Sequence, residues 1–190
     1  MQRKSFGEMP CPIARSLERV GEWWSILILR DALHGLKRFD QFQKSLGIAP
    51  NVLARRLNCL VDAGLLERRR YSDRPPRDEY VPTPRGHDFR PVLVALLAWG
   101  NKHFAPEGAS VVLVNTRTGM AVEPVLVDPV SGHPVEEPEY AFAAGPAAGK
   151  RTRRKYARVR GMHVGPDRRR ASTMTGGSAH ESTSKRGSRK

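Results

Sequence analysis

The sequence predicts a mainly helical α+β fold, in which part of the chain builds a packed core and the rest is solvated. Apolar residues make up 39% of the 190 residues and the mean hydropathy is −0.51, both low for a chain that folds throughout. Apolar residues recur at helical spacing mainly within the first 105 residues, and a Gly-, Ala-, Ser- and Thr-rich segment closes the chain. We expect four parts: an N-terminal arm at 1–10, a domain at 11–105, a small β-ribbon extension at 106–144 and a disordered basic tail at 145–190.

The domain is expected to begin with three helices. Pro12 suits the first turn of the first helix, and a second helix over residues 22–33 is apolar nearly all round, as in a buried central helix. A short extended piece at 37–39 follows. Asp40 is then expected to cap a third helix over 41–46.

A fourth helix and a hairpin follow in the sequence. The helix is expected from Pro50 to about Ala63, because proline suits a first helical turn and a glycine follows its end. Strand character at 65–71 and 79–81 flanks a polar loop at 72–78 that contains two prolines. This pattern predicts a β-hairpin with a projecting tip.

The last element of the domain is predicted to be a long helix. Thr83 is expected to cap it, Pro91 to kink it, and residue 103 to lie near its end. The predicted order is helix, helix, short strand, helix, turn, helix, strand, loop, strand and helix. This order predicts a winged helix-turn-helix.

Residues 106–149 contain an internal repeat with a period of thirteen. The segment Val-Leu-Val-Asn at 112–115 recurs as Val-Leu-Val-Asp at 125–128, and each is followed by a glycine and a Val-Glu pair at the same offsets. Each unit predicts a strand, a turn and a strand. Two such hairpins bury little by themselves, so we expect the extension to pack on the domain or on a partner subunit.

The charge of the chain favours a polyanionic partner. The net charge is +14, with +7 in residues 1–105, −5 in 106–149 and +12 in 150–190. Nucleic acid and an anionic membrane surface both fit this balance. The longest apolar run, 92–99, is far shorter than the ~20 residues that span a bilayer, and the two cysteines suggest no disulfide framework. We expect a cytoplasmic, nucleoid-associated protein with no membrane partner.

The fourth helix carries the main candidates for reading double-stranded DNA. Leu53, Leu57 and Leu60 share one face and should point into the core. A helix in the major groove can offer arginine to guanine or asparagine to adenine. The polar candidates on the other face and its flank are Asn51, Arg55, Asn58 and Arg56.

Two further pairs of basic residues are candidates for backbone contacts. Arg74 and Arg77 flank the two prolines of the hairpin tip, where they can reach phosphates or a minor groove. Lys37 and Arg38, before the third helix, are candidate phosphate contacts that carry no sequence information. For Arg74 and Arg77 the alternative is a solvated surface turn.

No pattern in the sequence favours an enzyme. It lacks a Gly-rich phosphate loop, a nucleophile elbow and a CxxC pair, and its six histidines lack metal-ligand spacing. We therefore expect no catalytic residue, no metal and no cofactor. The alternative to a sequence-specific DNA-binding protein is a basic nucleic-acid packaging or RNA-associated protein that binds without preference.

Residues 11–105 resemble the HxlR-type family of bacterial and archaeal regulators, which is similar to the MarR-like winged helix proteins. The resemblance spans about half of the chain, in order and at the right spacing. The matching pieces are Cys11-Pro12-Ile13, Gly21–Arg30, Lys37–Asp40, Leu53–Leu57, Asp62–Arg68, Pro75–Tyr80, Thr83–Gly86 and Trp99-Gly100. The sequence departs from the family in having Ala49 where a hydroxyl cap is common, and in its long extension.

The resemblance implies a transcriptional regulator, such as a repressor, that binds a roughly palindromic operator as a homodimer. It also implies that an unknown small molecule or oxidant releases the DNA, and it makes Cys11 a candidate redox-sensing residue, with Arg15 as a nearby positive charge. Dimer contacts in the family come from the first and last helices. Here these contacts fall on Ile13, Leu17, Val20, Val92, Leu96 and Trp99, and we expect some of these residues to belong to the core of the subunit.

Overall fold

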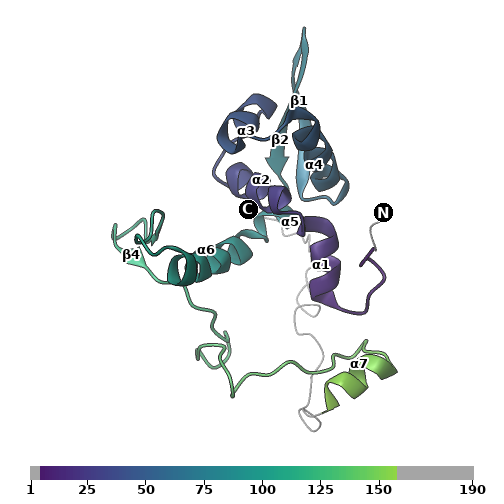
Figure 1. Cartoon of the computed structure of the whole chain (residues 1–190), viewed down its shortest axis with the longest axis vertical. Coiled ribbons are helices and arrows are strands. Elements are labelled where there is room, and N and C mark those ends of the chain that lie inside the picture. The colour runs from purple at the N-terminus through teal and green to yellow at the C-terminus, as the bar shows by residue number, and fades with distance from the viewer. Residues whose placement is uncertain (1–4, 158–190) are drawn as a thin grey trace, which may run out of the picture. The chain divides into compact units, whose positions relative to one another are not determined.

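The structure is a computed structural model that describes residues 5–157 and divides the chain into two compact units, 1–139 and 140–190. The first unit holds all the elements of the predicted domain and the extension (Figure 1). Its elements are α1 (Pro12–Val20), α2 (Trp23–Leu33), α3 (Phe39–Leu46), α4 (Pro50–Asp62), β1 (Leu66–Asp73), β2 (Pro76–Pro82), α5 (Pro84–His87), α6 (Arg90–Phe104), β3 (Leu113–Val114) and β4 (Ala121–Val122).

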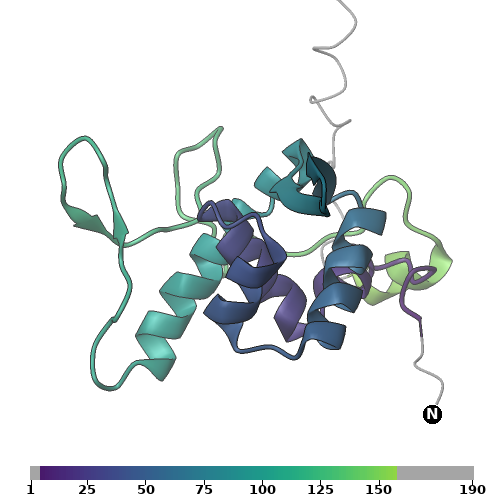
Figure 2. The same cartoon turned by 90° about the horizontal axis from the view of Figure 1, so that it is seen from above.

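The core of the first unit lies where α2, α3, α4 and the base of the hairpin meet. Ile28 and Leu29 of α2 are fully buried, which confirms α2 as the central apolar helix. The α4 leucines Leu53, Leu57 and Leu60 are also fully buried, as their spacing predicts. Together these elements form a winged helix-turn-helix, with α4 as the recognition helix and β1–β2 as the wing (Figure 2).

The third helix begins earlier than the sequence suggests. It starts at Phe39, so Asp40 lies inside its first turn and the prediction of an Asp40 cap is wrong. The side-chain oxygen of Gln41 instead accepts hydrogen bonds from the backbone N–H groups of Lys37 (3.0 Å) and Arg38 (2.9 Å). A side chain in the first turn that reaches back in this way holds the entry into the helix.

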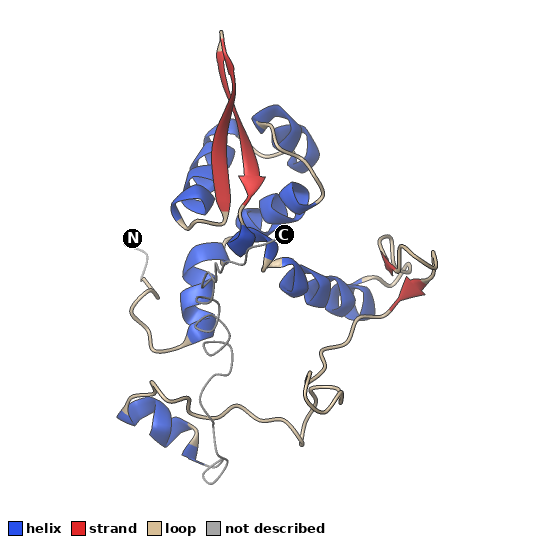
Figure 3. Ribbon diagram, turned by 180° about the vertical axis from the view of Figure 1, so that it is seen from behind, coloured by secondary structure: helices blue, strands red, loops and turns tan. Residues whose placement is uncertain are grey.

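The wing is longer and its tip tighter than predicted. Strands β1 and β2 pair antiparallel from Leu66↔Pro82 to Asp73↔Pro76, so the predicted loop at 72–78 belongs largely to the ladder. A register shift lies between Arg70 and Ser72. The hairpin therefore projects beyond the helices as a narrow two-stranded ribbon, which Figure 3 shows in red.

The predicted long last helix is two helices, α5 and α6, separated at residues 88–89. The Thr83 cap is confirmed, because its hydroxyl accepts from the Gly86 N–H at 3.1 Å and donates to the Gly64 carbonyl at 2.7 Å. Pro91 lacks an N–H and stands in the first turn of α6, so it starts a new helix rather than kinking one. A Cβ at Gly86 would come within 2.2 Å of the Leu65 carbonyl oxygen, so only glycine allows α5 to approach the wing so closely.

The internal repeat of the sequence is also a repeat in space. In the first unit of the repeat, the Gly119 N–H donates to the Asn115 carbonyl at 2.7 Å, and in the second the Gly132 N–H donates to the Asp128 carbonyl at 2.7 Å. Both glycines have positive φ, 71° and 74°. The strand pairing Val114↔Ala121 recurs thirteen residues later as the bridge Val127↔Pro134.

The second compact unit contains one described helix, α7 (Lys150–Lys155). This short helix lies where we expected disorder, and its Lys and Arg residues are good helix formers. Arg153 further fixes its start by donating from Nε to the Ala148 carbonyl at 2.8 Å. The predicted tail from residue 158 onward lies outside the described residues. Among the helices of residues 5–157, none has both the length and the hydropathy needed to cross a bilayer.

Candidate nucleic-acid interface

The exposed face of α4 carries Asn51 and Arg55, as predicted. Both side chains are exposed on the side away from the buried leucines. The Asn51 side-chain oxygen accepts from the N–H of Val52 at 2.9 Å, which leaves its amide N–H groups for an outside partner. No residue in the described range 5–157 forms an ion pair with Arg55, so its cation faces solvent.

Arg56 does not belong to this face. It is buried, with 8% of its surface exposed, and its guanidinium forms an ion pair with Glu22 at 3.0 Å, just before α2. Arg56 therefore ties the recognition helix to the central helix, and its inclusion among the predicted base-reading residues is wrong. Its Nε has no hydrogen-bond partner among the described residues.

Asn58 is exposed but already engaged. Its side-chain oxygen accepts a hydrogen bond from the guanidinium of Arg68 on β1, and the same guanidinium stands 5.6 Å above the ring centre of Tyr80 on β2. Arg68 thus connects α4 to the wing through a hydrogen bond and a cation–π contact. Sequence analysis did not single out Arg68, although its place in the run of three arginines on the predicted strand marked it as basic and exposed.

The arginines of the wing differ in their partners. Arg69 donates two hydrogen bonds to Glu67 (2.9 and 3.0 Å), and these bonds hold the pKa of the Glu67 carboxyl below its usual value. Arg70 pairs with Asp78 across the strands at 2.7 Å. Arg74 and Arg77 at the tip are exposed and form no ion pair with any residue that the structure describes. The tip therefore offers the cations that are free for an anionic partner.

Lys37 and Arg38 lie at the root of the wing. The Tyr80 N–H donates to the Lys37 carbonyl at 2.7 Å, and Arg38 forms an antiparallel bridge with Glu79. The Arg38 guanidinium stands 5.3 Å above the ring centre of Tyr71 on β1. Both basic side chains are exposed, and a single isolated bridge joins the backbone of Arg38 to β2. The structure thus places them beside the wing.

A second surface, which is apolar, lies on α1 and α6. Five of the six residues predicted for dimer contacts are exposed, and none of the residues of α6 is buried. The exception is Val20, which is 7% exposed and belongs to the core, as we expected for some of the six residues, and not to the exposed surface. The exposed five are Ile13, Leu17, Val92, Leu96 and Trp99.

Cys11 is partly exposed and occupies the N-cap position of α1. Arg15, which was expected to supply a nearby positive charge, donates from Nε to the Met9 carbonyl at 2.7 Å. A redox role for Cys11 stays a prediction. Cys59, on α4, is exposed.

Comparison with known proteins places the chain in a family. The profile described as HxlR-like helix-turn-helix matches residues 19–108, from the end of α1 to just beyond α6. An HTH-type transcriptional regulator of Mycobacterium tuberculosis, Rv3095, is 40% identical over 116 residues, which are 60% of this chain and 73% of that protein. The chain belongs to the HxlR-like helix-turn-helix family. This HxlR-like protein is therefore a DNA-binding regulator of transcription.

Other relatives of the HxlR-like protein agree with this assignment. An HTH-type transcriptional regulator of Synechocystis is 37% identical over 92 residues, covering 48% of this chain and 68% of that protein.

Two solved structures reach further along the chain. A candidate transcription factor of Pseudomonas aeruginosa, PA1374, is 58% identical with a TM-score of 0.57, over 76% of this chain and 99% of that one. PA1607, also a candidate transcription factor, is 37% identical with a TM-score of 0.67. The match covers 74% of this chain and 99% of that one. Residues 1–105 are just over half of this chain, so both matches include part of the extension.

Proposed function

We propose that the HxlR-like protein regulates transcription as a homodimer that recognises a roughly palindromic operator, with α4 of each subunit in the major groove. The observation that carries this proposal is the arrangement of α4: one face is locked in the core, and the other presents Asn51 and Arg55 to solvent beside a basic wing. Arginine and asparagine can each form two hydrogen bonds with one base, guanine and adenine respectively.

The wing and its root supply the backbone contacts in this proposal. Arg74 and Arg77 are free of ion pairs with the described residues, and Lys37 and Arg38 lie at the root of the same hairpin. Phosphate contacts of this kind fix the register of a protein on the duplex without reading its sequence. Asn58 contributes through its amide N–H groups, because its oxygen is bound to Arg68.

The homodimer rests on the apolar surface of α1 and α6. Trp99 on α6 is 54% exposed and Ile13 on α1 is 62% exposed, and leaving such large apolar side chains in water is costly. An isologous contact between two copies covers these side chains and places two recognition helices about one helical turn of DNA apart. An oxidant-sensing role for Cys11 and release of the DNA by a small molecule stay predictions within this scheme, and no contact of the described residues supports either.

Replacing Arg55 with alanine is expected to cost about 1–3 kcal/mol of binding free energy at the operator and to relax preference at one base position. The reason is that the exposed Arg55 side chain forms two hydrogen bonds with one base in the proposed complex, and alanine forms neither. Fluorescence anisotropy with operators that vary at each position measures both effects. The same affinity and the same base preference in the variant would show that α4 does not read DNA through this residue.

Deleting residues 150–190 is expected to weaken binding to all DNA sequences alike, because the deleted segment carries a net charge of +12. For every phosphate that the shortened chain no longer neutralises, the log–log slope of affinity against salt should become less steep by about 0.9. Titrations of operator and random duplex at several salt concentrations measure both effects. A loss of affinity for the operator alone would mean that this segment takes part in sequence recognition.

Selection of bound fragments from sheared source-genome DNA, with excess random competitor, separates the proposal from its alternative. A regulator should recover a few loci that share a two-fold symmetric motif and should prefer them by about 10³ or more. Uniform recovery across the genome would instead support a packaging protein.

A further inference from the structure

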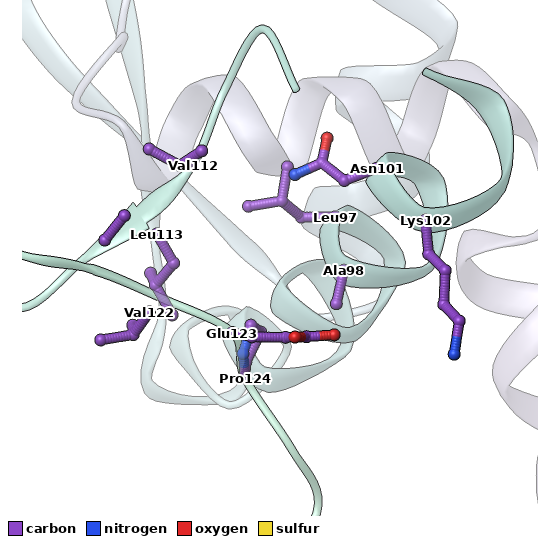
Figure 4. A pocket seen from close by; sticks show the side chains of 10 residues that line it. Leu97, Ala98, Asn101, Lys102, Val112, Leu113, Val122, Glu123 and Pro124 are labelled. Atoms are coloured by element: carbon purple, nitrogen blue, oxygen red, sulfur yellow. The ribbon is translucent and has the colours of Figure 1, made fainter. Parts of the chain in front are cut away.

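The first hairpin of the extension lies beside one side of α6 in its own chain. Val112 and Leu113 of this hairpin and Leu97 of α6 line an open groove of about 450 Å³ (Figure 4). At the groove, Asn101 of α6 donates from its side-chain nitrogen to the Val111 carbonyl at 2.9 Å. The first unit of the repeat is thus a strand–turn–strand module that lies beside α6, with Leu113 partly buried and Val112 49% exposed at the groove.

The second hairpin has the same backbone and a different environment. Val125 and Leu126 stand thirteen residues after Val112 and Leu113 and occupy the same places in the repeat. The Val135 N–H donates to the Leu126 carbonyl at 2.8 Å, which keeps the two strands paired. However, Val125 is 65% and Leu126 64% exposed. In the first hairpin the matching residues are less exposed, with Val112 at 49% and Leu113 partly buried, so the second hairpin leaves more of its apolar surface uncovered.

The opposite side of α6 is the surface that lacks a cover. Val92, Leu96 and Trp99 follow one another at i, i+4 and i+7 and are 47%, 41% and 54% exposed. Leu97 and Asn101, which face the first hairpin, lie on the other side of the helix. One chain thus exposes two apolar surfaces: one side of α6 and the second hairpin.

We propose that the second hairpin packs on the exposed side of α6 of a second copy of this chain. Each α6 is then held between the first hairpin of its own subunit and the second hairpin of its partner. This inference rests on the proposed homodimer and specifies which segment completes it. The net charges favour the same partner. Residues 106–149 carry a net charge of −5 and residues 1–105 a net charge of +7, so the extension of each copy is attracted to the domain of the other.

The test is the dimer dissociation constant of the full chain with Val125→Ser and Leu126→Ser, measured by sedimentation equilibrium. We expect the constant to rise on the order of tenfold or more, because two apolar side chains leave a protein interface. Both residues are exposed within one subunit, so the fold should be retained and circular dichroism checks it. If the serine variant destabilises the second hairpin, the variant with Val125→Thr and Leu126→Thr is measured in its place. Threonine is also polar but favours strands.

The matched control is Val130→Ser, which removes an apolar side chain that is 90% exposed at the turn of the same hairpin. Its dissociation constant should equal that of the unmodified chain. A dimer that is weakened by Leu96→Glu and unchanged by the Val125–Leu126 variants would overturn this inference and leave the proposed homodimer standing. An unmodified chain that stays monomeric at micromolar concentrations would overturn both.

Discussion

A chain that carries both Leu96→Glu and Trp99→Glu is expected to sediment as a monomer and to bind its operator on the order of 10²–10³ times more weakly. The two side chains are exposed on a helix that has no buried residue, so the folded subunit tolerates the charges. In the proposed dimer the same charges would face an apolar surface and lose their hydration. A monomer also forgoes the higher affinity that comes from holding two half-sites at once.

Sedimentation velocity and anisotropy titrations with a full operator and with a half-site measure this effect. Val130→Glu is the control, because it places a charge on another exposed apolar residue outside both helices. The half-site should be bound with similar affinity by the double variant and by the unmodified chain. If the double variant dimerises normally, α6 does not form the interface.

Replacing Arg56 with alanine is expected to lower the free energy of unfolding by about 2–3 kcal/mol. The substitution removes a buried guanidinium and the ion pair that it forms with Glu22, whose side chain is 29% exposed. Urea denaturation followed by circular dichroism measures the change. The magnitude is at the low end for a broken buried ion pair, because water still reaches Glu22.

The control for this experiment is the neighbouring residue in the sequence. Arg55→Ala, on the exposed side of α4, should change the free energy of unfolding by no more than about 0.5 kcal/mol while it weakens operator binding. The two arginines should therefore separate stability from recognition. Full stability together with altered base preference in the Arg56 variant would show that Arg56, despite its burial, turns outward to read DNA.

Local sequence rules were sufficient for the parts of the fold that depend on local contacts. The spacing of Leu53, Leu57 and Leu60 predicted the buried side of α4, and Thr83 predicted the cap of α5. The thirteen-residue repeat predicted two equivalent hairpins, because a glycine turn with positive φ needs only the few residues around it.

Contacts between distant residues explain where the predictions of the site were wrong. Arg56 is next to Arg55 on the helix, and only its pairing with Glu22, 34 positions earlier, shows that it is structural. Asn58 is exposed as predicted, but its hydrogen bond from Arg68 comes from another element. The error at the start of α3 is a local one. Gln41 accepts from the N–H groups of Lys37 and Arg38, whereas Asp40, the more common type of capping residue, lies within the helix.

The length of the wing sets the expected extent of the contact with DNA. The wing is anchored at Tyr80 and Glu79, which pair with Arg68 and Arg69, so the free part runs over about five residues from Arg70 to Arg74. At ~3.4 Å per residue it spans about 17 Å, which is half of a ~34 Å helical turn of DNA. In a hydroxyl-radical footprint, each subunit should therefore protect two separate patches of the sugar backbone, one beside the groove occupied by α4 and one about half a turn away.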